Sequence, residues 1–365
     1  MDSLNINQKT LLWLSLSGIS NDKMSKLLDY FGSAHNLWDN FENEKLNLTI
    51  LKTDIIDKLS ENKSDFEEKL LEKLNIKKAE IVTIYDDEYP SKLKQIEGAP
   101  NLLYYKGNLN FINDISIAVI GSRKATSYGK WAAEKLTKEL SEIGVNIVSG
   151  LAVGIDTIAH KTALKYNAKT YGIIGCGINV VYPKKNLELF KQISENDGAV
   201  ITEYPFDIQP VAFNFHARNR IISGLSEGVL VVEAQEKSGT LITAGHAANQ
   251  GREIFAVPGG INSLYSKGTN ALIRDGAKIT LSIDDIIEEI LELKERVKLQ
   301  NAFIDLSTLT DDEIRIMDSL KSGKNTVEEL RQEIKMETGE LLGNLTLLEM
   351  KGAIKVSADK ISLNI

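Results

Sequence analysis

Short apolar runs alternate with longer amphipathic segments through the middle of the chain. The runs have the length and composition of buried strands, and the segments between them have the apolar spacing of helices. This alternation predicts an α/β fold with a Rossmann-like, doubly wound and mostly parallel sheet. The runs are ISIAVI at 115–120, VNIVSG at 145–150, KTYGIIGC at 169–176, GAVITEYP at 198–205, GVLVVEA at 228–234 and EIFAVPG at 253–259.

The flanking segments have different patterns, which divide the chain into four parts. Residues 1–75 carry apolar residues three and four positions apart and are predicted to form a small helical domain, similar to SAM or helix-hairpin-helix modules. Residues 76–290 form the Rossmann-like domain with an extended lead-in, and residues 291–306 are interpreted as a linker. Residues 307–365 suggest three helices and a hairpin, the order of a winged helix-turn-helix, with the wing tip at 357–359.

Charge is distributed unevenly along these parts. The whole chain has 43 basic and 51 acidic residues, a formal net charge of −8. Residues 116–283 hold 18 Lys and Arg against 14 Asp and Glu, a net of +4, and residues 307–365 hold 8 against 11, a net of −3. A positive centre between acidic flanks can bind an anion. The acidic C-terminal part favours a packing or protein-contact role over reading DNA, because groove binding needs cations.

The cysteine, histidine and apolar content of the chain argues against disulfides, metal sites and membrane segments. Cys176 is the only cysteine, which excludes an internal disulfide and is typical of a reducing cytoplasm. The four histidines show no zinc-ligand spacing, so no metal is expected. We expect no membrane segment, because no run of about 18 apolar residues occurs and the N-terminus lacks the features of a signal peptide.

Two glycine motifs resemble nucleotide-binding signatures without completing them. GKW at 129–131 has the wrong spacing from Gly121 for a Walker A element, and a tryptophan replaces the hydroxyl that would bind magnesium. GCGINVVYP at 175–183 has Val180 in place of the third glycine of a dinucleotide fingerprint, and Pro183 prevents a helix from opening there. ATP hydrolysis and NAD-linked hydride transfer are therefore not supported, and no cofactor is expected.

Glycine, hydroxyl and basic residues instead follow most of the predicted strands. Ligands of open α/β sheets lie beyond the carboxyl ends of the strands, and many such loops along one edge suit a strand with successive phosphates. Arg218 and Arg220 have an alternative role, because either could pair with Glu203 or Glu233 and brace the fold. The candidate binding residues are Gly121, Ser122, Arg123, Ser149, Gly150, Gly154, Tyr182, Lys184, Lys185, Asn186, Arg218, Asn219, Arg220, Ser238, Gly239, Thr240 and Lys267.

Long motifs in these loops carry a resemblance to a known family. They are GSRKATSYG, SGLAVGIDTIAH, GCGINVVYPKKN, TEYP, RNRIISGLS, VVEAQEKSGTLITA, GREIFAVPG and KGTNALIRDGA. In these motifs, and in their order across 120–277, the chain resembles the DNA-processing protein A (DprA, or Smf) family. The resemblance implies a non-catalytic protein of natural transformation that binds and protects incoming single-stranded DNA without regard to sequence. It also implies a homodimer formed through the Rossmann-like domain and loading of the recombinase RecA.

The resemblance further assigns roles to particular residues. The arginine of its GSR motif and a lysine near its YP motif contact DNA, which implies Arg123 and Lys184 here, with Lys185 an equally placed neighbour. Residues 218–220 match the family's RNR element, and His216 stands where the family usually has proline.

Two nucleotide-based alternatives remain open. Phosphoribohydrolases of related fold carry a PGG…GT…E signature, and this chain has PGG at 258–260 and Gly268-Thr269. No glutamate follows, because residues 270–272 are Asn, Ala and Leu, so the general acid or base is missing and no catalytic residue is assigned. The second alternative is a nucleotide-sensing module that signals through its flanking domains.

Overall fold

The fold was analysed in a computed structural model of the chain, which divides into two compact units, Met1–Ile286 and Ile287–Ile365. The domain boundary predicted at 75/76 and the last part of the predicted linker, 303–306, lie outside the described residues. The residues that the structure describes are 4–64, 66, 79–302, 309–357 and 360–363.

A nine-stranded sheet runs through the described part of the first unit, in the order β1-β2-β6-β5-β4-β3-β7-β8-β9. Strands β6 to β9 in this order are all parallel, whereas β1 and β2 add an antiparallel edge beside β6. The predicted Rossmann-like, mostly parallel fold is therefore confirmed. The strands are β1 (Glu80–Thr83), β2 (Leu102–Gly107), β3 (Ser116–Ile120), β4 (Asn146–Ser149), β5 (Thr170–Ile173), β6 (Ala199–Thr202), β7 (Gly228–Val231), β8 (Glu253–Ala256) and β9 (Lys278–Ile279).

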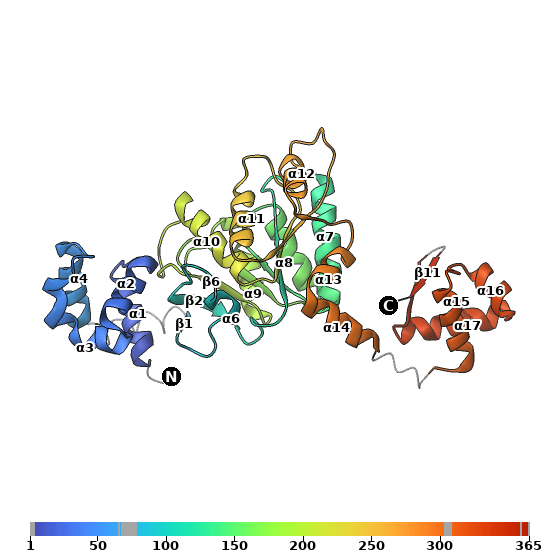
Figure 1. Cartoon of the computed structure of the whole chain (residues 1–365), viewed down its shortest axis with the longest axis horizontal. Helices are drawn as coiled ribbons and strands as arrows, with labels where there is room; N and C mark the ends of the chain where they lie inside the picture. Colours follow the sequence, from blue (N-terminus) through green and yellow to red (C-terminus); the bar gives the residue numbers. More distant parts are fainter. Residues whose placement is uncertain (1–3, 65, 67–78, 303–308, 358–359, 364–365) are drawn as a thin grey trace. The chain divides into compact units, whose positions relative to one another are not determined.

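Helices cover the sheet on both faces because the chain winds in two directions. From β3 it proceeds outward through β4 and β5 to β6, and then it crosses back to β7 and continues to β8 and β9. Right-handed crossovers in opposite directions place their helices on opposite faces. Helices α7, α8 and α9 pack beside one another, and α10 and α11 form a second packed group (Figure 1). The helices are α6 (Ser91–Lys94), α7 (Ser127–Glu142), α8 (Ile155–Lys165), η2 (Lys184–Asn186), α9 (Leu187–Glu195), α10 (Ala212–Gly224), α11 (Gly239–Asn249), α12 (Lys267–Arg274) and α13 (Asp284–Glu289).

The central strands are apolar along their length because they are covered on both faces. Every residue of β3, β4, β5, β6 and β7 is buried. This burial explains why the sequence shows continuous apolar runs here and no alternation of apolar and polar residues.

The N-terminal helices pack against the antiparallel edge of the sheet. Asn5 caps the first helix with a capping box, and Trp13 of that helix is fully buried. The Tyr104 hydroxyl of β2 donates to Ser15 Oγ at 2.8 Å, and one apolar cluster joins these helices to β2. The helices are α1 (Ile6–Leu16), α2 (Asn21–Phe31), α3 (Ala34–Glu44), η1 (Lys45–Asn47) and α4 (Thr53–Ser64).

In the described part of the second unit, helix α14 is followed by three helices and a two-stranded antiparallel sheet that share an apolar core. Residues 291–302, interpreted from sequence as linker, are helical, and Leu293 within them is buried. Residues 358–359 of the predicted wing tip lie outside the described residues, and the winged-helix assignment stays a prediction. The elements are α14 (Leu291–Ala302), α15 (Asp311–Lys321), α16 (Val327–Ile334), α17 (Thr338–Met350), β10 (Ile354–Ser357) and β11 (Lys360–Leu363). None of the helices described has the length and apolarity needed to span a membrane.

Candidate nucleic-acid interface

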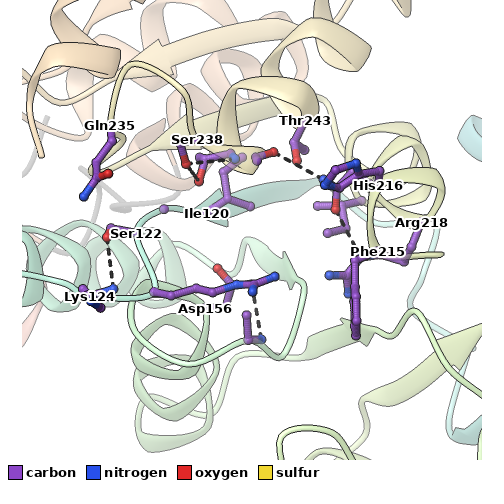
Figure 2. A pocket seen from close by; sticks show the side chains of 17 residues that line it. Ile120, Ser122, Lys124, Asp156, Phe215, His216, Arg218, Gln235, Ser238 and Thr243 are labelled. Carbon is purple, nitrogen blue, oxygen red and sulfur yellow. Dashed lines mark hydrogen bonds between the residues drawn. The ribbon is translucent and has the colours of Figure 1, made fainter. Parts of the chain in front are cut away.

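The strand order reverses at β3, which lies between β4 and β7. Open α/β sheets bind their ligands at such a reversal, in the crevice at the carboxyl ends of the strands. A cavity of about 440 Å³ occupies this place, and side chains from four connections surround it (Figure 2). Its lining residues are Ile120, Gly121, Ser122, Arg123, Lys124, Ala152, Asp156, Phe215, His216, Arg218, Asn219, Ile222, Gln235, Ser238, Gly239, Thr240 and Thr243.

The cavity gathers about half of the residues predicted for binding. The remaining predicted residues lie outside it, and they are Ser149, Gly150, Gly154, Tyr182, Lys184, Lys185, Asn186, Arg220 and Lys267.

The loop after β3 is held in place by close backbone contacts. The Ser122 carbonyl oxygen accepts from Ile155 N at 3.2 Å, which joins this loop to the start of α8. Gly154 has φ +86°, and a Cβ there would lie 2.2 Å from the same carbonyl oxygen. A Cβ on Gly121 would lie 2.7 Å from the Ile155 side chain. These glycines therefore serve close packing, which fixes the base of the loop.

Arg123 and Lys124 project from this fixed loop into solvent. Both side chains are exposed, and neither has a hydrogen-bond or ion-pair partner within the described residues. The Ser122 hydroxyl accepts from Lys124 N at 3.1 Å, so the predicted phosphate donor also shapes its own loop. The tip of the loop thus presents two free positive charges at the mouth of the cavity.

A carboxylate of the chain itself caps the helix that follows this loop. Glu233, at the end of β7, is buried, and its Oε1 and Oε2 accept from Thr126 Oγ1 at 2.5 Å and Thr126 N at 3.0 Å. Thr126 is the N-cap of α7, and a Cβ on Gly129 would lie 2.2 Å from this carboxylate. Dinucleotide folds hold a pyrophosphate at the N-terminus of the first helix. Here Glu233 occupies that place, a role that the sequence analysis did not assign.

Arg218, a predicted DNA-binding residue, is buried and has partners inside the fold, and its contact with a ligand stays a prediction. Its Nη1 donates to Gly150 O at 2.9 Å and to Ile173 O, and only 4% of the residue is exposed. Burial lowers the pKa of Arg218 to about 10. Arg218 therefore connects α10 to the ends of β4 and β5, and it contributes a positive charge to the lining of the cavity.

Asp156 lies beside Arg218 in the floor of the cavity (Figure 2). Its Oδ2 accepts from Gly150 N at 3.2 Å and from Ala152 N at 3.4 Å. Burial raises the pKa of Asp156, and the charges of Arg218 and Arg123 and the two backbone donors oppose that rise. The sequence analysis did not include Asp156 among the binding residues. Its contacts are those of a group that orients the loop after β4.

Arg220 braces the fold, which is the alternative that the sequence left open. Its Nη1 and Nη2 donate to Glu203 Oε1 at 3.1 Å and Oε2 at 2.7 Å, and both side chains are largely buried. Asn219 lines the cavity and accepts from Arg218 Nε at 3.3 Å. In the RNR element, Arg218 and Asn219 line the cavity and Arg220 does not. Asn219 is uncharged, whereas Arg218 carries a buried charge.

Two further predicted residues use their polar atoms inside the fold. The Ser149 hydroxyl is fully buried and donates to Val119 O at 2.7 Å. Asn186 is buried, and its Nδ2 donates to Leu151 O at 2.9 Å. Ser149 and Asn186 therefore use these polar atoms to join neighbouring parts of the fold, and their contact with a ligand stays a prediction.

The loop after β5 carries exposed groups along the same edge of the sheet. Lys184 and Lys185 are exposed, and their side chains have no hydrogen-bond or ion-pair partner in the described part of the chain. Tyr182 is 47% exposed, and its ring lies 5.4 Å from that of Phe215, which lines the cavity. This aromatic pair connects the lysine loop to the cavity.

The connections after β7 and β8 complete the edge. Ser238 caps α11 by accepting from Thr240 N at 3.2 Å, and Gly239 beside it is exposed. Lys267 is exposed at the start of α12. Gln235 and His216 also line the cavity, although nothing in their sequence context marks them as binding residues.

The site offers little for nucleotide hydrolysis or metal chemistry. Asn270 belongs to the stretch 270–272, in which a phosphoribohydrolase would carry glutamate, and it donates from Nδ2 to Gly259 O at 3.0 Å and accepts from Gly259 N at 3.2 Å. Among the described residues, no group of three His, Cys, Asp or Glu side chains is placed to hold a metal ion.

Comparison with known proteins identifies the family. The sequence profile of DNA recombination-mediator protein A matches residues 80–291. The DNA processing protein DprA of Streptococcus pneumoniae strain R6 is 40% identical over 283 residues, which cover 76% of this chain and 95% of that protein. The chain belongs to the DNA recombination-mediator protein A family. The family's description as a mediator agrees with the prediction that the chain is not an enzyme.

Solved structures of the DNA recombination-mediator protein A family resemble this fold. An X-ray structure of the S. pneumoniae DprA is 37% identical and has a TM-score of 0.67, with 79% of this chain and 99% of that chain covered. A structure of DNA processing protein A from Helicobacter pylori, titled for its single-stranded DNA binding mode, is 31% identical with a TM-score of 0.53. That match covers 58% of this chain and 96% of the H. pylori chain.

Proposed function

We propose that the chain binds single-stranded DNA, without regard to sequence, along the carboxyl edge of its parallel sheet. The observation that carries the proposal is the exposed, unpaired guanidinium of Arg123 at the mouth of the cavity where the strand order reverses. The H. pylori relative is described as binding single-stranded DNA, and it matches more than half of this chain. Arg123 offers a planar fork for phosphate oxygens, with Lys124 beside it.

The charges along the edge suit several successive phosphates better than one. Lys184 and Lys185 follow β5, Arg123 and Lys124 follow β3, and Lys267 begins the helix after β8. These strands are neighbours in the order β5-β4-β3-β7-β8, so the charges span four strand spacings, about 19 Å. A single mononucleotide phosphate contacts one or two such loops, whereas a strand tracks all of them.

Further parts of the proposal follow from the family resemblance. The bound strand is incoming DNA in natural transformation, which the protein protects and on which it loads RecA. The protein acts in the cytoplasm as a homodimer through its Rossmann-like domain, so two binding faces raise its apparent affinity.

The test is fluorescence anisotropy of a labelled single-stranded oligonucleotide at two salt concentrations. We expect wild-type binding that weakens with salt, and an Arg123→Ala variant that binds about tenfold or more weakly. Lys138→Ala is the matched control. Its lysine is 40% exposed on α7 and lies toward the end of that helix remote from the Arg123 loop, so binding should stay at the wild-type level.

Two results would contradict the proposal. If the wild-type protein does not bind the single-stranded oligonucleotide at low salt, the proposal is refuted. Saturable binding of a nucleoside monophosphate, with no tightening as oligonucleotides lengthen from about four to twelve residues, would favour the nucleotide-sensing alternative.

A further inference from the structure

Two aromatic side chains lie exposed, one helical turn apart, on α7. Tyr128 is 44% exposed and Trp131 is 58% exposed. Their ring centroids are 6.0 Å apart, and the rings are inclined by 31°. Residues three positions apart lie on the same helix face, so the two rings form one apolar surface, which we call the Tyr128–Trp131 surface.

The Tyr128–Trp131 surface is held in position at one end and open at the other. The Tyr128 hydroxyl donates to Pro258 O at 2.8 Å, which fixes this ring against the loop after β8. Trp131 is the most exposed of the three tryptophans, since Trp13 is fully buried and Trp38 is partly buried. Single exposed apolar residues are ordinary on a protein surface, but Trp131 and Tyr128 form a contiguous pair of exposed aromatic rings on one helix face.

Two lysines of α7 lie close to these aromatic residues in sequence, Lys130 and Lys135, and Lys135 is paired with Glu139. Lys130 is exposed, with no ion-pair partner within the described residues, and Lys135 Nζ lies 5.9 Å from the Trp131 ring centroid. The nearby carboxylates are engaged: Glu134 lies 3.7 Å from Lys165 and Glu139 lies 3.5 Å from Lys135. Exposed aromatic rings among cations are the composition of a surface that binds single-stranded nucleic acid.

The Tyr128–Trp131 surface continues from the proposed DNA-binding edge. Thr126 caps α7, so Tyr128 lies in the first turn of the helix that starts where the Arg123 loop ends. The contact of Tyr128 with Pro258 places the surface toward β8, which lies on the opposite side of β3 from the lysine loop after β5. A strand that leaves the Arg123 loop in that direction passes over these rings.

We propose that Tyr128 and Trp131 form a base-stacking site for single-stranded DNA whose phosphates are held by Arg123 and Lys124. This inference rests on the proposed function and adds a binding site to it. Every base has a π face, so stacking here is tolerant of sequence. Loss of a stacking ring weakens single-strand binding by about tenfold, toward the lower end of the range for such sites.

The intrinsic fluorescence of Trp131 tests the proposal in the full chain. On titration with unlabelled oligodeoxythymidine, tryptophan emission falls in wild type, because a stacked base quenches the indole. The fall persists in Trp38→Phe and is lost in Trp131→Phe, although Trp131→Phe still binds a labelled strand at nearly wild-type affinity because phenylalanine also stacks. Trp131→Ala binds about tenfold more weakly. Tyr30→Ala is the matched control, since Tyr30 is a 53% exposed aromatic residue on the N-terminal helix α2, and it leaves both signals unchanged.

The outcomes separate this inference from the function on which it rests. If wild type does not bind the strand at all, both fail. If Arg123→Ala weakens binding while Trp131→Ala binds normally, or if the fluorescence change survives in Trp131→Phe, the proposed function stands and the stacking site is wrong. A change in the sedimentation of DNA-free Trp131→Ala would show that the surface contacts protein, and this would also overturn the stacking site.

Discussion

The ion pair of Arg220 and Glu203 gives a direct test of whether the second arginine of the RNR element binds DNA or braces the fold. Two hydrogen bonds, 3.1 and 2.7 Å long, join the guanidinium to both carboxylate oxygens. The side chains are only 16% and 10% exposed. The Arg220→Ala variant therefore leaves Glu203 as an uncompensated, largely buried charge.

The magnitude follows from that burial. Removing one partner of a buried ion pair costs about 3–5 kcal/mol, and the small remaining exposure of this pair favours the lower end. A loss of about 3 kcal/mol is a large share of the 5–15 kcal/mol that stabilises a typical protein. We expect Glu203→Ala to cost a similar amount, because it leaves Arg220 unpaired. The double variant should cost less than the sum of the two single variants, since neither charge is then left alone.

Urea denaturation followed by far-ultraviolet circular dichroism measures the free energies of unfolding, and anisotropy at low temperature measures DNA binding of the folded fraction. If the ion pair only stabilises the fold, the Arg220→Ala protein should be less stable than wild type. Its folded fraction should still bind single-stranded DNA almost normally. A variant that keeps wild-type stability within about 1 kcal/mol and loses DNA binding would refute this reasoning. Such a result would return Arg220 to the role that its sequence motif suggested.

Three further predictions concern other parts of the chain. Gly154→Ala places a Cβ 2.2 Å from a carbonyl oxygen at φ +86°, so it should cost about 1–3 kcal/mol of thermal stability, whereas Gly245→Ala, with open space around it, should not destabilise. In the C-terminal unit, burial raises the pKa of Glu313, but hydrogen bonds that include one from Lys351 outweigh it and leave the pKa below its ordinary value. Stability should therefore be full above the unfolded-state pKa of about 4.3 and fall as pH drops through the folded value, and Glu313→Gln should flatten this dependence in urea titrations. Burial raises the pKa of Cys176 to about 11, so a thiol reagent at pH ~8 should label the chain only after denaturation, and rapid native labelling would contradict its burial.

The sequence was sufficient to predict the sheet because parallel strands have a strong local signature. The runs at 115–120, 145–150 and 228–234 contain β3, β4 and β7, and the glycines after them mark the turns. The start of the linker at 291 was wrong, because residues 291–302 are helical and a charged helix with few apolar residues resembles a linker in composition. Where apolar periodicity is weak, tertiary contacts such as the burial of Leu293 decide the conformation.

The place of the cavity was also predictable, whereas the internal partners of the residues around it were not. Glycine and basic residues in the connections after the strands identify the edge. By this criterion Arg123, in the loop after β3, and Arg218, in the connection after β6, are equally good candidates. What distinguishes them is burial and partners: Arg123 is exposed, and Arg218 donates to two backbone carbonyl oxygens beneath the cavity. Those partners are 68 and 45 positions away in sequence, so no local pattern could assign them.

Where the strand order reverses at β3, polar groups of the chain bind one another. This supports a DNA strand over a single nucleotide as the ligand of this edge. Glu233 occupies the helix terminus that could bind a pyrophosphate, and Asp156 occupies the amides after β4. These anion sites are filled by the chain's own carboxylates. Exposed positive charges lie at the rim, among them those of Arg123, Lys124 and the lysines after β5. A ligand held at the rim is contacted through its backbone charge and its exposed faces, not enclosed and read by shape. Binding of that kind depends on the length of the strand and on salt, and very little on its sequence.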